Sequence, residues 1–264
     1  MQNEKSRTYR FLYAVAPYCS IILFLIGWTV LSYCKGEIVA SPLEVLSRLL
    51  RLCREPLAHN YIWGHIWASL RRILIALSIA IVTGIPFGIL VGWNPWFSGT
   101  FGTLFEMIRP VPALAWIPLF VIWMGIGETP KIVMVFLGAF MPIVVNSYTG
   151  VRLVSPLYLD VGKIFHAKTS YQVLKNIIIP AALPVIFAGI KNAASVCWTV
   201  VLAAEMIAAN AGLGFLITRG MTSFDIPLIM CCMILIGILG VLTTLLMNFL
   251  ERKLCPWNSS LEKK

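Results

Sequence analysis

Charged side chains are scarce in this sequence. Asp, Glu, Lys and Arg together make up 12% of its 264 residues, whereas soluble domains carry roughly 25%. So few charges cannot cover a surface that faces water, and 59% of the residues are hydrophobic. The composition therefore indicates a protein whose surface mostly faces lipid. We expect an all-α, polytopic membrane protein.

Several signatures of catalysis and ligand binding are also missing. The chain has no GxxxxGK[ST] phosphate loop, and no Ser/His/Asp set or paired carboxylates in a soluble segment. Its seven cysteines form no CxxC and have no His at ligand spacing, which argues against a disulfide framework or a metal site. We expect no catalytic residues, no metal and no cofactor.

The formal charge is +10, but no basic cluster stands apart from an apolar run, so nucleic acid is not an expected partner. Six apolar runs are long enough to cross a bilayer. They cover residues 11–33, 73–93, 101–124, 131–150, 185–209 and 226–250. The first run is too long for a cleavable signal and is expected to be retained. The third is interrupted by Arg109-Pro110-Val111-Pro112 and again by Pro118.

The distribution of Lys and Arg predicts the orientation. With both termini inside, the inner segments carry eleven of these residues and the outer segments carry eight, Arg72 among them. This excess favours both termini in the cytoplasm of a multi-pass cell-membrane protein. We divide the chain into residues 1–61 (tail, first span and an outer helix), a core at 62–258, and a cytoplasmic tail at 259–264.

Residues 41–54 predict an amphipathic helix. Ser41-Pro42-Leu43-Glu44 is typical of a helix start, with Glu44 at the capping-box position. At helical spacing, one face carries leucines and the other carries charges: Leu43, Leu46, Leu49 and Leu50 against Glu44, Arg48, Arg51 and Arg54. The pattern is compatible with a helix lying on the membrane surface and equally with a plain connecting helix.

The longest polar interruption in the second half is Ser155 to Pro184. Ser155 followed by Pro156 predicts a helix start, and Thr169 or Ser170 can cap a second short helix. Pro180 and Pro184 are expected to end that second helix. The pattern predicts two short amphipathic helices in water, with an ordinary solvated loop as the alternative.

This stretch resembles the cytoplasmic coupling loop of ABC importer permeases. The ending IIIPAALP matches the family well, whereas Asp160-Val161-Gly162 stands where Glu-Ala-Ala is usual, and His166 or Ala167 where the family has Gly. The distance to Pro180 is one residue longer than usual. The resemblance implies that this loop contacts an ATP-binding subunit. The contact residues would be Tyr158, Asp160, Val161, Gly162, Phe165, His166, Ala167 and Tyr171.

Further short motifs occur in the family's order from about residue 41 to 258. They are Ser41-Pro42-Leu43-Glu44, His65-Ile66 with Ser69-Leu70 and Arg72, Arg109-Pro110-Val111-Pro112, Gly125-Ile126-Gly127-Glu128, Gly150-Val151-Arg152, Ala204-Glu205-Met206 and Leu250-Glu251-Arg252. Together they resemble permeases for nitrate, sulfonate, taurine and bicarbonate, and some for thiamine precursors.

The resemblance implies a type I importer fold and a transport subunit that is not an enzyme. Two permease copies, a homodimer, would form the pathway. An ATP-binding subunit dimer and an extracytoplasmic solute-binding protein would be its partners. It leaves open whether the solute is a small anion or another small organic molecule. A secondary transporter is the alternative class, and it would need an internal inverted repeat, which is not seen.

Charged and polar residues within spans are the site candidates, because burying a charge in hydrocarbon is costly. We expect Arg109 to pair with Glu106, three residues earlier, and Lys191 to reach the inner surface by its long side chain. Glu205 has no partner nearby in sequence, so it should meet one from another helix. The candidates for the pathway or gate are Arg109, Asn146, Trp198 and Glu205. For Arg109 and Glu205, a purely structural role is the alternative.

Overall fold

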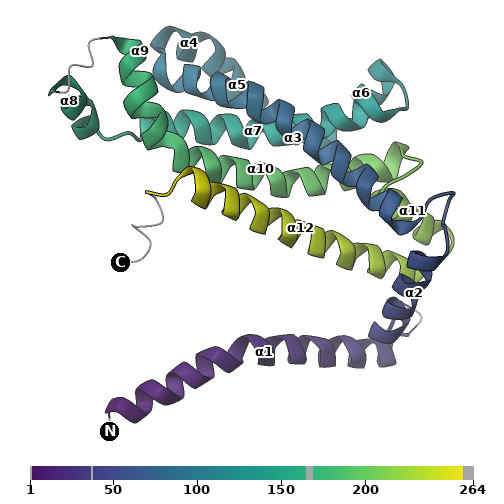
Figure 1. Ribbon diagram of the computed structural model, residues 1–264. Coiled ribbons are helices and arrows are strands. Elements are labelled where there is room, and N and C mark those ends of the chain that lie inside the picture. Colours follow the sequence, from purple (N-terminus) through teal and green to yellow (C-terminus); the bar gives the residue numbers. More distant parts are fainter. Residues whose placement is uncertain (1, 37, 165–168, 258–264) are drawn as a thin grey trace. The chain divides into compact units, whose positions relative to one another are not determined.

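The computed structural model describes residues 2–36, 38–164 and 169–257, and Figure 1 shows its helices. The described residues form two compact units, 1–62 with 216–234, and 63–215 with 235–264. All regular elements in the described ranges are helical. They are α1 (Gln2–Cys34), α2 (Pro42–Arg54), α3 (Ile62–Trp93), α4 (Pro95–Phe97), η1 (Ser98–Gly102), α5 (Thr103–Ile108), η2 (Ala113–Trp116), α6 (Ile117–Met124), α7 (Glu128–Arg152), α8 (Pro156–Ile164), α9 (Ser170–Val173), η3 (Leu174–Ile178), α10 (Ile179–Ala208), α11 (Leu213–Thr222) and α12 (Ile226–Leu254).

Helix α2 in the first unit begins as expected. The Ser41 side chain accepts a hydrogen bond from the Glu44 amide, and the Glu44 carboxylate accepts one from the Ser41 amide at 2.7 Å. This reciprocal capping satisfies two amide donors that a helix start leaves free. The predicted capping box at Ser41 is therefore confirmed.

The predicted charged face of α2 is partly covered at Arg48, whose side chain is 23% exposed. Val45 and Leu52 are buried, and Arg48, which lies between them at helical spacing, binds the Asp225 carboxylate at 2.6 Å. Asp225 also accepts a hydrogen bond from the Leu228 amide at the start of α12. The predicted leucine face stays open, since Leu43, Leu46 and Leu50 are more than half exposed. The sequence pattern could not reveal that an ion pair draws Arg48 inward.

In the second unit, α3 packs closely on α7 through a row of glycines spaced by four. Gly84, Gly88 and Gly92 face Ile143, Ser147 and Val151 of α7. At Gly88 an added Cβ would lie 2.5 Å from the Ser147 Cβ and 2.7 Å from the Val144 carbonyl oxygen. Small residues at such positions let helix backbones approach each other in lipid.

Helices α7 and α10 lie side by side in Figure 1, with α8 and α9 at one end and α6 at the other. Close approaches recur along this pair. Gly138 of α7 faces Val200, Gly150 faces Ala182, and Gly189 of α10 faces Asn146. These two helices are the central packed pair of the second unit, and the polar sites described below lie at their two ends.

The predicted break at Arg109–Pro112 is confirmed, because these residues separate α5 from η2, and the helical segments on either side are bent by 82°. At the second predicted break, Pro118 lies in the first turn of α6, directly after the 3-10 segment η2, so a change of helix type occurs there. A missing amide donor costs nothing in a first turn.

The expectation that Pro180 and Pro184 end the helix after Thr169 is wrong. Residues 170–207 form one helical stretch that includes both prolines. The segment Leu174–Ile178 is a π-helical turn, and Pro180 follows it at the start of α10. Local π geometry rearranges the hydrogen bonds around a proline, so the helix continues.

Four helices within the described residues are long and apolar enough to cross a membrane: 62–93, 128–152, 170–207 and 226–254. The bent pair 95–108 and 113–124 counts as a fifth if it forms one broken span. The chain is thus an all-α multi-pass membrane protein. The count of six spans stays a prediction.

We predict that Gly88→Ala destabilises the α3–α7 contact, because the Val144 carbonyl beside it belongs to a backbone that cannot move away. Overpacking of this kind costs about 1–3 kcal/mol in free energy of unfolding. Thermal unfolding of the purified protein in detergent measures the loss. Gly99→Ala is the matched control, since an added Cβ there meets nothing within 4 Å. Equal stability of the two variants would contradict the close contact.

Candidate functional site

The segment that follows α7 carries the first candidate site. Helix α8 starts at Pro156 after Ser155, as predicted. Of the two predicted caps, Thr169 and Ser170, it is Thr169 that caps α9, through a capping box with Gln172. The first of the two expected short helices is confirmed as α8 (Pro156–Ile164). The second is not a separate short helix, because α9 is the first part of the continuous helical stretch 170–207. Gly162 is buried against Ile177, and a Cβ at Gly162 would overlap the Ile177 side chain. Gly162 therefore sets how closely α8 approaches η3.

The predicted contact residues of this segment divide into two groups. Tyr158 and Tyr171 are 56% and 67% exposed, and Asp160 is exposed as well. The Lys175 ammonium lies 5.9 Å from the centre of the Tyr171 ring. Phe165, His166 and Ala167, together with the Val161 side chain, lie outside the described residues. The described part presents an apolar and aromatic surface to its surroundings.

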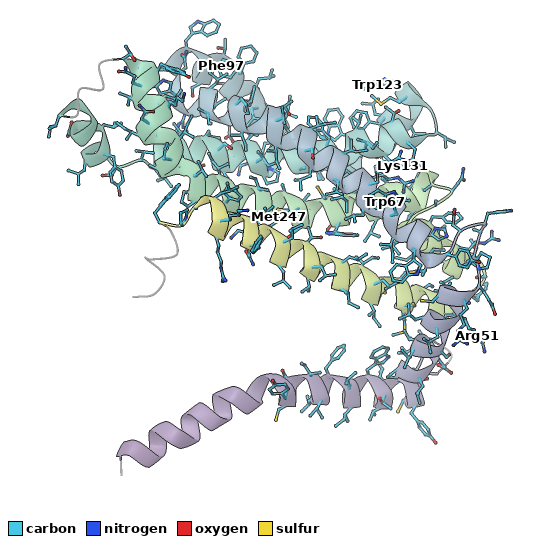
Figure 2. The ribbon with its side chains drawn as sticks, in the orientation of Figure 1. Arg51, Trp67, Phe97, Trp123, Lys131 and Met247 are labelled. Carbon is cyan, nitrogen blue, oxygen red and sulfur yellow. The ribbon has the colours of Figure 1, made fainter. Side chains whose placement is uncertain are left out.

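A buried ion cluster forms the second candidate site, at the opposite end of α7 and α10. Arg72 of α3 donates to Glu205 of α10 at 2.6 Å, and the two side chains are 3% and 0% exposed. Arg72 also donates twice to Glu128, the first residue of α7, at 2.7 Å each, and Lys131 donates to Glu128 at 2.6 Å. Figure 2 labels Lys131 at this end of the helices, with Trp67 of α3 nearby. The positive charges of Arg72 and Lys131 are therefore matched by the negative charges of Glu128 and Glu205.

The same cluster holds the N-terminal turn of α11. The Gly212 amide donates to His65 Nδ1 at 3.2 Å, and the Leu213 amide donates to Ser69 Oγ at 3.0 Å. The Gly214 amide donates to Glu205 at 2.9 Å, and Ser69 Oγ donates to the same carboxylate oxygen at 2.9 Å. These bonds satisfy amides that the start of a helix leaves free.

Glycine is needed at this turn. Gly212 has φ +132°, a conformation that L side chains rarely adopt, and a Cβ there would overlap the Glu205 carboxylate. At Gly214 a Cβ would lie 2.6 Å from the Leu202 carbonyl oxygen. The Ala-Gly-Leu-Gly sequence thus lets the chain close directly over the buried carboxylate.

The prediction that Glu205 meets a partner from another helix is confirmed, but the partner was missed. Arg72 was counted among the outer charges, while the structure buries it. A signal for it exists in the sequence: His65, Ser69 and Arg72 are spaced i, i+4 and i+7, which places them on one face of α3. A polar stripe on an otherwise apolar helix indicates a buried polar contact.

Helix α10 carries three polar side chains at seven-residue intervals, Lys191, Trp198 and Glu205. This spacing keeps them on one face, with a drift of about 20° per interval. Lys191 binds the Glu251 carboxylate of α12 at 2.7 Å, so it forms an ion pair, whereas we had expected it only to reach towards the inner surface. The Trp198 indole N–H donates to Thr243 Oγ1 of α12 at 3.3 Å.

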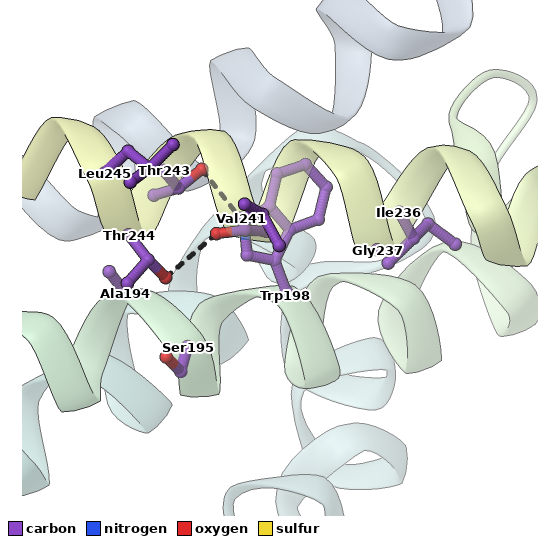
Figure 3. Close-up of a pocket in the computed structure, with 10 residues that line it drawn as sticks. Ala194, Ser195, Trp198, Ile236, Gly237, Val241, Thr243, Thr244 and Leu245 are labelled. Atoms are coloured by element: carbon purple, nitrogen blue, oxygen red, sulfur yellow. Dashed lines mark hydrogen bonds between the residues drawn. The ribbon is translucent and has the colours of Figure 1, made fainter. Parts of the chain in front are cut away.

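A cavity of about 380 Å³ lies between α10 and α12, around Trp198 (Figure 3). Its walls include three hydroxyl side chains, Ser195, Thr243 and Thr244, and two glycines, Gly237 and Gly240. Thr243 and Thr244 donate their hydroxyl protons to carbonyls one turn earlier in α12. The cavity is therefore mostly apolar, with a few polar groups at fixed positions, as is usual for small-molecule sites.

The four pathway candidates do not converge on one site. Trp198 lines the cavity, and Glu205 lies in the ion cluster. Asn146 donates to the Pro142 carbonyl of its own helix at 2.8 Å. Arg109 pairs with Glu106 at 3.3 Å, as predicted, and both side chains are about half exposed. The described residues contain no group of three or more His, Cys, Asp or Glu side chains that could hold a metal.

Residues 84–258 match the family described as binding-protein-dependent transport system inner membrane component. The taurine transport system permease protein TauC of Escherichia coli is 35% identical over 91% of this chain and 88% of that protein. The nitrate import permease protein NrtB of Synechocystis is 31% identical over 96% of this chain and 95% of that protein. The putative aliphatic sulfonates transport permease protein SsuC of Bacillus subtilis is 30% identical over 86% and 82%.

Among solved structures, a chain of the MetNI methionine ABC transporter in an inward-facing conformation has the same fold. The TM-score is 0.60 at 22% identity, over 73% of this chain and 97% of that chain.

We predict strong coupling between Arg72 and Glu205. Arg72→Gln alone leaves a buried carboxylate without its main partner and should cost about 3–5 kcal/mol of stability. Arg72→Gln combined with Glu205→Gln should recover about 2 kcal/mol of that loss. Thermal unfolding of the four proteins completes the cycle.

The exposed pair Glu106 and Arg109 provides the control cycle, with an expected coupling of only about 0.3–0.5 kcal/mol. Additive effects in the Arg72–Glu205 cycle would mean that the two charges do not depend on each other.

Proposed function

The chain belongs to the family of inner-membrane components of binding-protein-dependent transport systems, and we propose that it is the permease for a small oxyanion such as a sulfonate or nitrate. Membership makes it a transport subunit of an ABC importer and not an enzyme, with ATP hydrolysis in a separate subunit. An ATP-binding subunit and a solute-binding protein are its partners in the importer.

The identity of the solute class is supported by the relatives. Permeases for taurine, nitrate and aliphatic sulfonates are all similar to this chain over more than four fifths of its length. The cavity between α10 and α12 supports the same class, since no acidic side chain lines it and its polar groups are hydroxyls and an indole. We therefore infer that the solute passes this cavity, with Trp198 at its wall.

We propose that α8 and α9 contact the ATP-binding subunit. Their exposed aromatic side chains, Tyr158 and Tyr171, lie on a short polar segment between two apolar helices, where a partner's groove can cover them. Asp160 is exposed beside them and suits a basic residue of that partner. The remaining predicted contacts at Val161, Gly162, Phe165, His166 and Ala167 belong to the same proposal.

We further propose a homodimer of permeases in the lipid bilayer, with both termini and α8–α9 in the cytoplasm. The Lys and Arg distribution supports this orientation. In it, the Arg72–Glu205 cluster lies at the outer end of the helices. Glu205 then forms part of the outer gate, because it holds the turn at residues 211–214 to α3.

We predict that Tyr171→Ala and Tyr158→Ala weaken the contact with the ATP-binding subunit. If each tyrosine is a main anchor, its truncation should cost about 2 kcal/mol, roughly thirtyfold in affinity. The measurement is co-purification of the ATP-binding subunit, with substrate-stimulated ATP hydrolysis in liposomes. Tyr33→Ala is the control, since Tyr33 of α1 is 95% exposed and belongs to the other unit. Normal co-purification and stimulation in both variants would show that α8 and α9 are not the coupling element.

We also predict a role for the hydroxyl of Thr243. Thr243→Val removes the acceptor of the Trp198 indole and should raise the KM for uptake roughly fivefold, as expected for one hydrogen bond of about 1 kcal/mol. Uptake of taurine, nitrate and a neutral organic solute is compared in liposomes that hold the complete transporter. Thr83→Val is matched, because Thr83 likewise bonds a carbonyl four residues earlier, on α3. Uptake of only the neutral solute would reject the oxyanion assignment.

A further inference from the structure

Glu128 occupies a position that suits an exchangeable anion. Its two carboxylate oxygens receive the Arg72 Nε–H and Nη2–H at 2.7 Å each, and one of them also receives Lys131 Nζ at 2.6 Å. The two cations are almost fully buried, with side-chain exposures of 3% and 4%, while the Glu128 side chain is 47% exposed. Glu128 is therefore the member of this group that solvent can reach.

A cavity of about 240 Å³ opens beside this carboxylate. Its walls are formed by Glu128, Arg72, Arg71, Trp67, Gly64 and Ala68. Lys131 is not part of the wall and meets the cavity only through Glu128. A small molecule in this cavity would approach the carboxylate and the fork of the Arg72 guanidinium together.

The charges of the cluster favour exchange of one anion for another. Glu205 stays bound to Arg72 Nη1 from the other side, with side chains almost fully buried. If Glu128 withdraws, Arg72, Lys131 and Glu205 leave one net positive charge, and Arg71 in the cavity wall adds a second. A guanidinium fork binds two oxygens of one group, so a sulfonate or nitrate can take the position that the carboxylate leaves.

The backbone around Glu128 allows it to withdraw. Glu128 is the first residue of α7, so moving it disturbs only the end of the helix and leaves the interior turns intact. It follows Gly125, at φ +74°, and Gly127, where an added Cβ meets nothing within 4 Å. The N-terminus of the 25-residue helix α7 would add to the attraction for an incoming anion.

We propose that Glu128 is an internal stand-in for the transported oxyanion, which displaces it from Arg72 and Lys131 at an entry site distinct from the α10–α12 cavity. This inference rests on the proposed function, because it takes the solute to be an oxyanion. When Glu128 is released, the ion pair between Arg72 of α3 and Glu128 of α7 is lost. Because Arg72 also binds Glu205, the arrival of the anion is coupled to the gate at Glu205.

The test is titration of the purified permease with sodium methanesulfonate or sodium nitrate, at ionic strength held constant with sodium chloride. Tryptophan fluorescence reports binding, since Trp67 lines the cavity. Glu128→Gln removes the competing charge and should tighten methanesulfonate binding at least tenfold. Glu55→Gln makes the same charge change at an exposed position and should bind as the wild type does.

Two further variants test whether tighter binding arises from the lost charge or from a misfolded protein. Glu128→Asp keeps the charge but shortens its reach, so binding should tighten by a smaller factor. Lys131→Met added to Glu128→Gln should abolish the gain. Wild-type binding in both Glu128 variants, or a gain that survives without Lys131, would overturn the proposal.

The outcomes also separate this site from the wider function. If the complete wild-type transporter takes up no oxyanion, the proposed function fails, whatever the titrations show. If uptake is normal and the Glu128 variants bind methanesulfonate as the wild type does, only the entry site is rejected. If the variants respond to the solute-binding protein but not to methanesulfonate, the displacing group is an acidic side chain of that protein, and the site for a free anion is overturned.

Discussion

The buried ion pair between Arg72 and Glu205 is the constraint on which the second unit depends. The two side chains are only 3% and 0% exposed, and each would cost several kcal/mol to bury alone. Their neutralisation requires three helices, α3, α7 and α10, and the turn before α11 to meet at one place. The glycines of α3, α7 and α10 and the Gly212 turn are consistent with this requirement, because each removes a side chain where two backbones must come close.

The polar face of α10 relates the sites to one another. Lys191, Trp198 and Glu205 follow at seven-residue intervals, so about 10 Å of helix separates each contact from the next. The first two contact α12, and the third contacts α3. A rotation of α10 about its axis would disturb all three contacts together. A movement that starts at η3, where α10 begins, can therefore reach the opposite end of the same helix as a rigid-body change.

Local features were predicted from the sequence, and contacts over long distances were not. The capping box at Ser41, the cap at Thr169 and the Glu106–Arg109 pair involve residues at most three apart, so the sequence shows them directly. Glu205 was expected to need a partner because hydrocarbon does not tolerate a lone charge. Nothing nearby in the sequence named Arg72, which lies 133 residues away. The sequence pattern places Arg72 outside the span because charges usually mark span ends. It predicts a helix end at Pro180 because a π-helical turn has no simple sequence signal.

The π-helical turn at Leu174–Ile178 lies between α9 and α10 within one helical stretch. In an α-helix, one extra residue would rotate everything before it by about 100° relative to everything after it. A π-turn takes up one residue as a local bulge. The backbone geometry of this turn therefore helps to set which way the exposed side of α9 faces relative to α10.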